Sequence, residues 1–166
     1  MIEIRALAFL LRVHDWLAQA FFVIASAALV AATSLFLFEV AARYIFAAPT
    51  AWSSEYIRYC LVAIIFMALP EMTRQKAHIA IEIVPEYLSR DMARLLGNLN
   101  LMISAVVSGV AGWIVGLEAL KQFESGLMTN AAFPIQRYPL TALIAFGFLG
   151  ASSFFLRQIF DKREHQ

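Results

Sequence analysis

Three long uncharged stretches limit the folds open to this chain of 166 residues. They cover Leu17–Phe38, Leu95–Leu117 and Tyr138–Leu156, and contain 22, 23 and 19 residues. About 20 apolar residues in a helix are enough to cross the roughly 30 Å hydrocarbon core of a bilayer. The chain is also 61% hydrophobic and only 15% charged, whereas a soluble domain is about half apolar and a quarter charged. We therefore predict an all-α integral membrane protein.

The first stretch has a competing interpretation as a cleavable signal peptide, because the Ala-rich residues 25–32 resemble a cleavage site. Its uncharged run exceeds the roughly 7–15 residues of a signal-peptide core, so we favour an uncleaved span. The residues ahead of it, 1–15, carry Arg5 and Arg12 seven positions apart among apolar residues. This pattern predicts a short N-terminal amphipathic segment at the membrane surface.

A fourth span must be inferred from a shorter run. Only the 12 residues Tyr59–Pro70 are free of charge there, which is too few to cross. A spanning helix therefore has to begin near Ala51, with Thr50 as its N-cap, and to carry Glu55 and Arg58 in its first turns.

We thus expect one domain over residues 1–166 with four transmembrane helices. The predicted spans lie at about 17–42, 51–73, 92–118 and 138–159, with an interfacial segment between the second and third. The last two spans contain small residues three or four positions apart, which favour close helix contact. These are Ser104, Ser108, Gly109 and Gly112 in the third span, and Gly147 and Gly150 in the fourth.

The distribution of Lys and Arg predicts the orientation. Nine lie in the N-terminal segment, the 71–94 segment and the C-terminal tail, against four in the 39–58 and 118–137 connections. Because basic residues are enriched in cytoplasmic loops, we expect both termini in the cytoplasm and the 39–58 hairpin outside.

The 39–58 hairpin carries two acid–base pairs whose members are three or four residues apart: Glu39 with Arg43, and Glu55 with Arg58. Residues at that spacing share a helix face, and charges at membrane depth are costly unless paired. Three interpretations remain open: an ion network between the first two helices, a docking surface for partner proteins, or an ion pathway. Tyr44 and Trp52 are interpreted as interfacial anchors.

Other polar residues give weaker signals. His78 and Glu82 are four positions apart, but two ligands without a third do not predict a metal site, so we interpret them as a polar contact to a partner. His14 and His165 are interpreted as ordinary surface residues. The single cysteine, Cys60, excludes an internal disulfide. We expect no metal, no cofactor and no enzyme activity, because no catalytic or phosphate-binding motif occurs. A net charge of +1 does not favour nucleic-acid binding.

The 43–82 segment resembles the small membrane subunit of tripartite ATP-independent periplasmic (TRAP) transporters, the DctQ type. The residues that carry this resemblance are Arg43-Tyr44-x-Phe46, Pro49, Trp52, Glu55 and Arg58, followed by His78-Ile79 and Glu82. The resemblance implies a four-helix subunit of the bacterial inner membrane that scaffolds a large membrane subunit, which holds the sodium and substrate sites. It also implies docking of a periplasmic substrate-binding protein that delivers a substrate, typically an organic acid, besides contact with membrane lipids. The residues expected at subunit interfaces or docking surfaces are Glu39, Arg43, Tyr44, Trp52, Glu55, Arg58, His78 and Glu82.

Three other classes of membrane protein fit the sequence less well. A membrane anchor subunit of a respiratory oxidoreductase needs haem-ligating histidines inside its spans, and none of the three histidines lies within a predicted span. A four-helix drug exporter needs a carboxylate deep in its bundle, whereas Glu39 and Glu55 lie near the ends of their predicted spans. An intramembrane protease needs a Ser–His or paired Asp arrangement, and the predicted spans contain neither.

Overall fold

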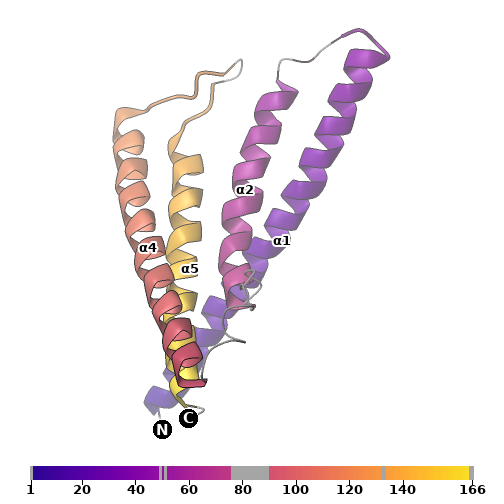
Figure 1. Cartoon of the computed structure of the whole chain (residues 1–166). Helices are drawn as coiled ribbons and strands as arrows, with labels where there is room; N and C mark the ends of the chain where they lie inside the picture. The colour runs from indigo at the N-terminus through magenta and orange to yellow at the C-terminus, as the bar shows by residue number, and fades with distance from the viewer. Residues whose placement is uncertain (1, 49, 51, 76–89, 132–133, 165–166) are drawn as a thin grey trace.

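Four helices form the part of the chain that the computed structural model describes, residues 2–48, 50, 52–75, 90–131 and 134–164. They are α1 (Ile2–Tyr44), α2 (Ser53–Arg74), α4 (Arg90–Ser125) and α5 (Tyr138–Glu164) (Figure 1). Each contains a segment long and apolar enough to cross a membrane: Leu11–Tyr44, Ser53–Arg74, Leu95–Ser125 and Tyr138–Phe160. The predicted all-α membrane fold with four spans is therefore confirmed.

Helix α1 includes the expected N-terminal amphipathic segment as its beginning. The 43 residues of α1 measure about 65 Å at 1.5 Å per residue, roughly twice the thickness of a hydrocarbon core. The helix contains neither Gly nor Pro, and these are the residues that most strongly interrupt helices. The lead-in therefore continues into the span without a break. The expected interfacial segment between the second and third spans falls on 76–89, outside the described residues.

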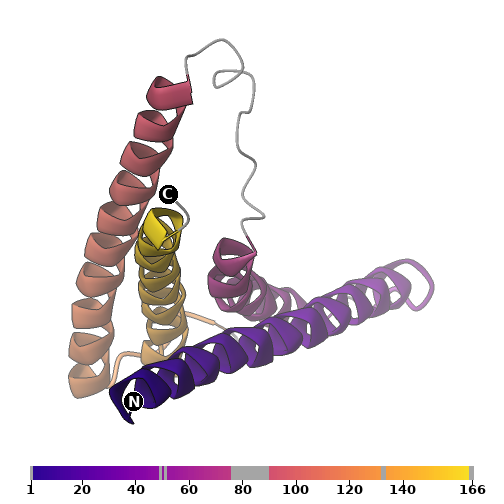
Figure 2. The same ribbon diagram turned by 90° about the horizontal axis from the view of Figure 1, so that it is seen from below.

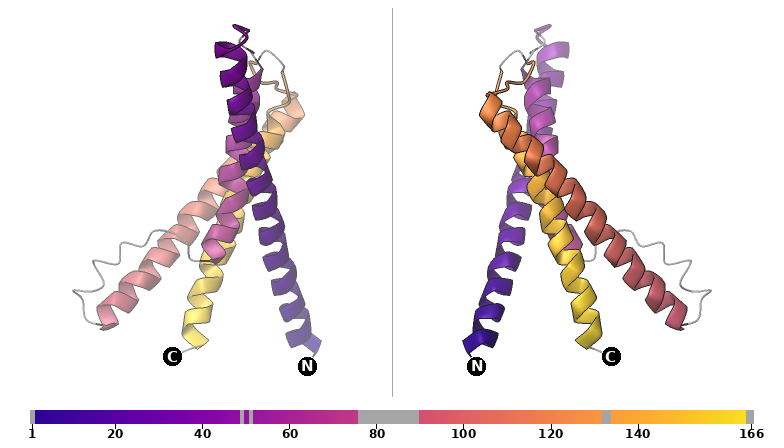
Figure 3. Two further views of the ribbon diagram at one scale, coloured as in Figure 1. Left: turned by 90° about the vertical axis from the view of Figure 1, so that its right-hand side faces the viewer. Right: turned by 90° about the vertical axis from the view of Figure 1, so that its left-hand side faces the viewer.

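The helices pack in the order α1, α2, α5, α4, so that α2 and α5 lie inside and α1 and α4 lie at the two edges. Figures 1 and 2 show this arrangement from the side and from below. Both termini lie at one end of the molecule, where α1 and α4 diverge to opposite sides of α5 (Figure 3). The chain thus forms two antiparallel hairpins, α1–α2 and α4–α5, that meet through α2 and α5.

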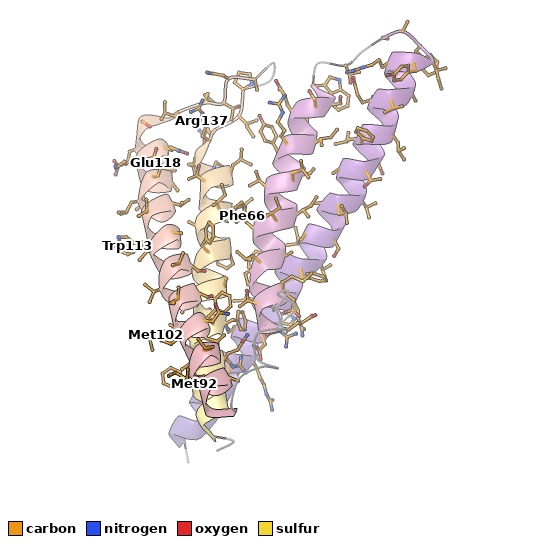
Figure 4. All side chains as sticks on the ribbon, viewed as in Figure 1. Phe66, Met92, Met102, Trp113, Glu118 and Arg137 are labelled. Atoms are coloured by element: carbon orange, nitrogen blue, oxygen red, sulfur yellow. The ribbon has the colours of Figure 1, made fainter. Side chains whose placement is uncertain are left out.

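Glycines allow the closest helix contacts. Gly147 of α5 lies against Phe66 of α2, where an added Cβ would be 2.4 Å from the Phe66 carbonyl oxygen. Gly150, one turn further, lies against the ring of Pro70. Figure 4 shows Phe66 between the two helices. Both glycines therefore serve the α2–α5 contact, as the spacing of small residues predicted.

The α4–α5 contact uses the other predicted small face. An added Cβ at Gly112 would be 2.8 Å from Leu149, and one at Gly109 would be 3.1 Å from the Ser152 hydroxyl oxygen. Ser152 donates a hydrogen bond across the interface to the Ala105 carbonyl oxygen, at 2.7 Å. This bond satisfies a hydroxyl that would otherwise be buried without a partner.

Large apolar side chains cover the outer faces of the edge helices. On α4, Met102 and Trp113 point away from α5 (Figure 4) and are 51% and 67% exposed. On α1, Val23 and Val30 are 66% and 68% exposed. These faces suit lipid or the apolar surface of another membrane protein, because the described residues of the chain leave these side chains exposed.

Candidate functional site

Glu39 organises the end of the molecule opposite the termini. It lies near the end of α1, its residue is 7% exposed, and its Oε1 accepts a hydrogen bond from Arg43 Nη2 at 2.8 Å. Its Oε2 accepts one from Ser53 Oγ at 2.7 Å and one from the Thr50 backbone N–H at 3.2 Å. The Thr50 hydroxyl also donates to Oε2. The predicted Glu39–Arg43 pair is therefore present, and the carboxylate also joins α1 to the beginning of α2.

Thr50 does not cap α2, contrary to the prediction. The N-cap is Trp52, and its side chain makes no capping hydrogen bond. Thr50 lies two residues earlier, where its hydroxyl contacts Glu39 and lies 2.9 Å from Ser53 Oγ. The carboxylate of Glu39, from the preceding helix, places negative charge near the positive end of the α2 dipole.

The remaining predicted residues of the hairpin differ in exposure. Trp52 is half-buried and lies between Phe38 and Tyr56, at ring-centroid distances of 6.0 Å from each. Tyr44 is 81% exposed. Arg58 is exposed, and its Nε donates to the Ser54 carbonyl oxygen at 3.3 Å. The described residues of this chain leave Arg58 exposed. The predicted ion pair between Arg58 and Glu55 stays a prediction.

The α1–α2 connection has an unusual backbone at its tip. Ala47 has φ 50°, the left-handed region in which glycine is usually found after a helix. The Ala48 N–H donates to the Ala42 carbonyl oxygen at 3.0 Å, across the turn. The turn leaves Ile45 and Phe46 each 74% exposed at the tip.

The second long connection is fixed to α2. Residues on the two sides of 132–133 pair with each other: Thr129 N–H donates to the Ile135 carbonyl oxygen at 2.8 Å, and Arg137 N–H donates to that of Leu127 at 3.0 Å. The hydroxyl of Tyr59 on α2 lies 3.3 Å from that of Thr129. The two connections thus lie at the same end of the molecule (Figure 1).

A second polar cluster, which we call the terminal clasp, joins three helices at the end where the termini lie. Its residues are His14 and Asp15 of α1; Glu71, Thr73 and Arg74 of α2, with Gln75 after it; and Ser153, Arg157 and Gln158 of α5. The sequence interpretation missed it as a site.

The α1–α5 half of the terminal clasp includes His14, and the interpretation of this histidine as a surface residue was wrong. His14 Nε2 lies 2.9 Å from Ser153 Oγ, and its ring stacks on Phe154 with 4.1 Å between centroids. The next residue, Asp15, accepts a hydrogen bond from Arg157 Nη1 at 2.5 Å. His14 also lies within Leu11–Tyr44, the part of α1 that is apolar enough to cross a membrane, although the predicted span begins only at residue 17. His165 is outside the described residues.

The α2 half of the terminal clasp is centred on Glu71, which is only 2% exposed. Arg74 donates to both oxygens of Glu71, at 2.7 and 2.5 Å, and Gln75 Nε2 donates to Oε1 at 2.6 Å. Gln158 of α5 donates to the carbonyl oxygen of Thr73 at 2.5 Å. The end of α2 is therefore fixed both by its own side chains and by α5.

Loss of the Glu71 carboxylate should weaken this end of the molecule. We expect Glu71→Ala to lower the free energy of unfolding by about 1–3 kcal/mol, because it strands Arg74 and Gln75, although Arg74 keeps some access to water. Glu71→Gln, which keeps one acceptor oxygen, should lose less. Thermal unfolding of the purified chain in mild detergent measures both. The control is Glu118→Ala, since Glu118 is exposed and accepts one 3.3 Å hydrogen bond from Gln122; an equal loss there would contradict a special role for Glu71.

Two predicted residues, His78 and Glu82, lie outside the described residues. Among the residues that the structure does describe, no three His, Cys, Asp or Glu side chains gather as a metal-binding group. In both clusters some of the described polar side chains join one helix to another.

Comparison with known families gives one match. Residues 32–165 match the family described as "Tripartite ATP-independent periplasmic transporters, DctQ component". No curated protein matches the chain. The family match covers α2, α4 and α5 and includes Glu39, Glu71 and the α5 residues of the terminal clasp. Since it also extends over most of the sequence, the chain belongs to the DctQ family and is a small membrane subunit of a TRAP transporter.

Proposed function

We propose that this chain scaffolds the large membrane subunit of a sodium-coupled TRAP uptake system and helps to dock its periplasmic substrate-binding protein. One observation carries the proposal: three acidic side chains are engaged in hydrogen bonds within the chain, two of them between helices. Glu39 joins α1 to α2, Asp15 joins α1 to α5, and Glu71 fixes the end of α2. Carboxylates engaged in this way are suited to rigidity rather than to binding a transported ion, so we place the sodium and substrate sites on the large subunit.

The docking surface that we propose for the binding protein is the end with the 45–52 and 126–137 connections. There, Arg43 is exposed, and the apolar tip at Ile45 and Phe46 stands clear of the chain. Exposed charges at such a rim steer the encounter with a partner, while the Glu39 contacts hold the backbone beneath them in place.

Identification of the partners tests the proposal. The chain, purified from its own membrane in mild detergent with a C-terminal tag, should bring with it one much larger multi-pass protein of the TRAP type. Binding of the periplasmic protein should then require both membrane subunits. Recovery of the chain without a large membrane partner, under conditions that keep other inner-membrane complexes intact, would contradict it.

The orientation proposed from the basic residues can be tested by labelling. In a background with Cys60→Ser, a membrane-impermeant thiol reagent added to intact spheroplasts should label a cysteine introduced by Ala48→Cys and spare one introduced by Gln166→Cys. After the cells are opened, both should react. The opposite pattern would reverse the topology, and with it the proposed docking end.

Arg58 offers a test of assembly that is separate from folding. Because Arg58 is exposed in the chain, Arg58→Ala should change the stability of the isolated subunit by less than about 0.5 kcal/mol. If lipid or the large subunit covers it, however, the same variant should sharply reduce the yield of the complex and its uptake, and Glu55→Ala in addition should restore part of both. Normal yield and uptake for Arg58→Ala would show that this arginine faces water.

A further inference from the structure

An open groove of about 400 Å³ lies between α4 and α5. Small residues form its floor and large apolar side chains form its walls. Tyr138 supplies its one polar side chain. The lining residues are Gly116, Ala119, Leu120, Phe123, Tyr138, Ala142, Ala145, Phe146 and Leu149. The groove thus offers a continuous hydrocarbon surface with a polar group at one end.

The length of the groove equals about one leaflet of a membrane. Along α5 its lining extends from Tyr138 to Leu149, 11 residues, which at 1.5 Å per residue is about 16 Å. The hydrocarbon core is roughly 30 Å thick. Tyr138 stands at the first residue of α5, so the groove begins near the membrane surface and ends near the midplane.

Contacts between α4 and α5 hold the mouth of the groove in shape, and a cationic residue, Arg137, comes next to it in the chain. The Thr141 hydroxyl donates to Gln122 Oε1 at 2.7 Å, which ties α5 to α4 there. Phe123 and Tyr138 meet edge to face with 5.0 Å between ring centroids, as aromatic residues do at membrane interfaces. Arg137 directly precedes Tyr138 in the chain (Figure 4), and its backbone N–H donates a hydrogen bond to the Leu127 carbonyl oxygen.

We propose that this groove binds one acyl chain of a membrane phospholipid, with the lipid phosphate at Arg137. An arginine is well suited to phosphate because its guanidinium presents several donors in a planar fork. A transmembrane helix of another subunit fits less well, because a helix is about 10–12 Å wide and continues through both leaflets, whereas the groove stops halfway. Arg137 belongs to the 126–137 connection, so the lipid site adjoins the proposed docking end, and lipid retention tests it separately from binding of the periplasmic protein.

Native mass spectrometry of the purified complex, titrated with 1-palmitoyl-2-oleoyl phosphatidylglycerol, tests the site. Wild type should retain one phospholipid that Ala142→Phe, which fills the groove from an exposed position, loses. The matched control is Ala31→Phe on the exposed face of α1. Arg137→Gln should weaken phosphatidylglycerol binding at least several-fold and leave binding of the corresponding diacylglycerol, which has no phosphate, unchanged. Lys121→Gln serves as its control, because Lys121 is exposed on α4.

The outcomes separate the two occupants. Loss of the retained lipid in Ala142→Phe, with the large subunit still bound, supports the proposal, as does loss of the phosphate preference in Arg137→Gln. If Ala142→Phe instead releases the large subunit and keeps the lipid, the groove holds a partner helix and the proposal is overturned. Equal lipid retention in Ala142→Phe, Ala31→Phe and Arg137→Gln would overturn it as well. If Ala142→Phe fails to fold, the comparison of phosphatidylglycerol and diacylglycerol binding by Arg137→Gln tests the proposal alone.

Discussion

Gly147→Ala should separate the two hairpins of the molecule. The added Cβ would be 2.4 Å from the Phe66 carbonyl oxygen and 3.0 Å from its carbonyl carbon. Backbone atoms cannot rotate out of the way as the end of a side chain can, so α2 and α5 would have to move apart. Overpacking usually costs about 1–3 kcal/mol, and we expect a loss at the upper end of that range, with a matching fall in the yield of the complex.

The control for Gly147→Ala is Gly116→Ala. Gly116 faces α5 as well, but an added Cβ there would be 3.8 Å from the Ala145 Cβ, an ordinary contact. Alanine in a helix interior is favoured over glycine by roughly 1 kcal/mol, so this variant should be neutral or slightly more stable. Thermal unfolding in detergent compares the two. Changes of the same sign and size would contradict the close α2–α5 contact.

Glu39→Ala should free the end of α1 from the beginning of α2. Hydrogen bonds from Arg43, Thr50 and Ser53 converge on this one carboxylate, and the Ser53 side chain is fully buried. The variant would leave these donors without their shared acceptor, and Ser53 has no access to water as a substitute. We expect a clear fall in melting temperature and loss of binding-protein docking, since the hairpin above the contacts would no longer be held.

Two milder variants set the scale for Glu39. Glu39→Gln keeps a carbonyl oxygen for Ser53 and Thr50 and should lose less than Glu39→Ala. Arg43→Ala removes the exposed member of the salt bridge, whose side chain is 58% accessible to solvent, and exposed ion pairs contribute little. The expected order of melting temperatures is therefore Arg43→Ala, Glu39→Gln and Glu39→Ala, from highest to lowest. If Glu39→Ala were as stable as Arg43→Ala, the central role of Glu39 in holding α1 to α2 would be contradicted.

The number of spans could be predicted from the sequence because it depends on local properties. Uncharged length decides whether a helix can cross a membrane, and this held even for α2, whose uncharged run was short. The spacing of Gly147 and Gly150 likewise indicated a packing face, since small residues matter to any close neighbour. Which helix would be that neighbour required the structure.

Most of the terminal clasp could not be predicted from local properties of the sequence. The Asp15–Arg157 pair joins residues 142 positions apart, and no spacing rule within one helix can find it. Glu71 lies near the end of the predicted second span, 51–73, and α2 continues through Pro70 and Glu71 to Arg74, but the part that Glu71 plays in the clasp was not predicted. One usable signal was His14-Asp15 just ahead of an uncharged stretch, because polar residues at that position need partners.

Thr50 was misinterpreted for a related reason. Its place before a predicted helix made it a good N-cap by type, but a buried carboxylate from the preceding helix competes for the same hydroxyl. The Glu39–Arg43 pair, in contrast, was predictable because its members are four residues apart on one helix.

Uptake by reconstituted vesicles tests the central claim that this chain is a non-transporting subunit on which transport depends. Vesicles that contain both membrane subunits, supplied with the periplasmic protein and a sodium gradient, should accumulate substrate. Vesicles with this chain alone, and vesicles with the large subunit alone, should accumulate none above an empty-vesicle control. Sodium-dependent uptake by this chain alone, or full uptake in its absence, would contradict the claim.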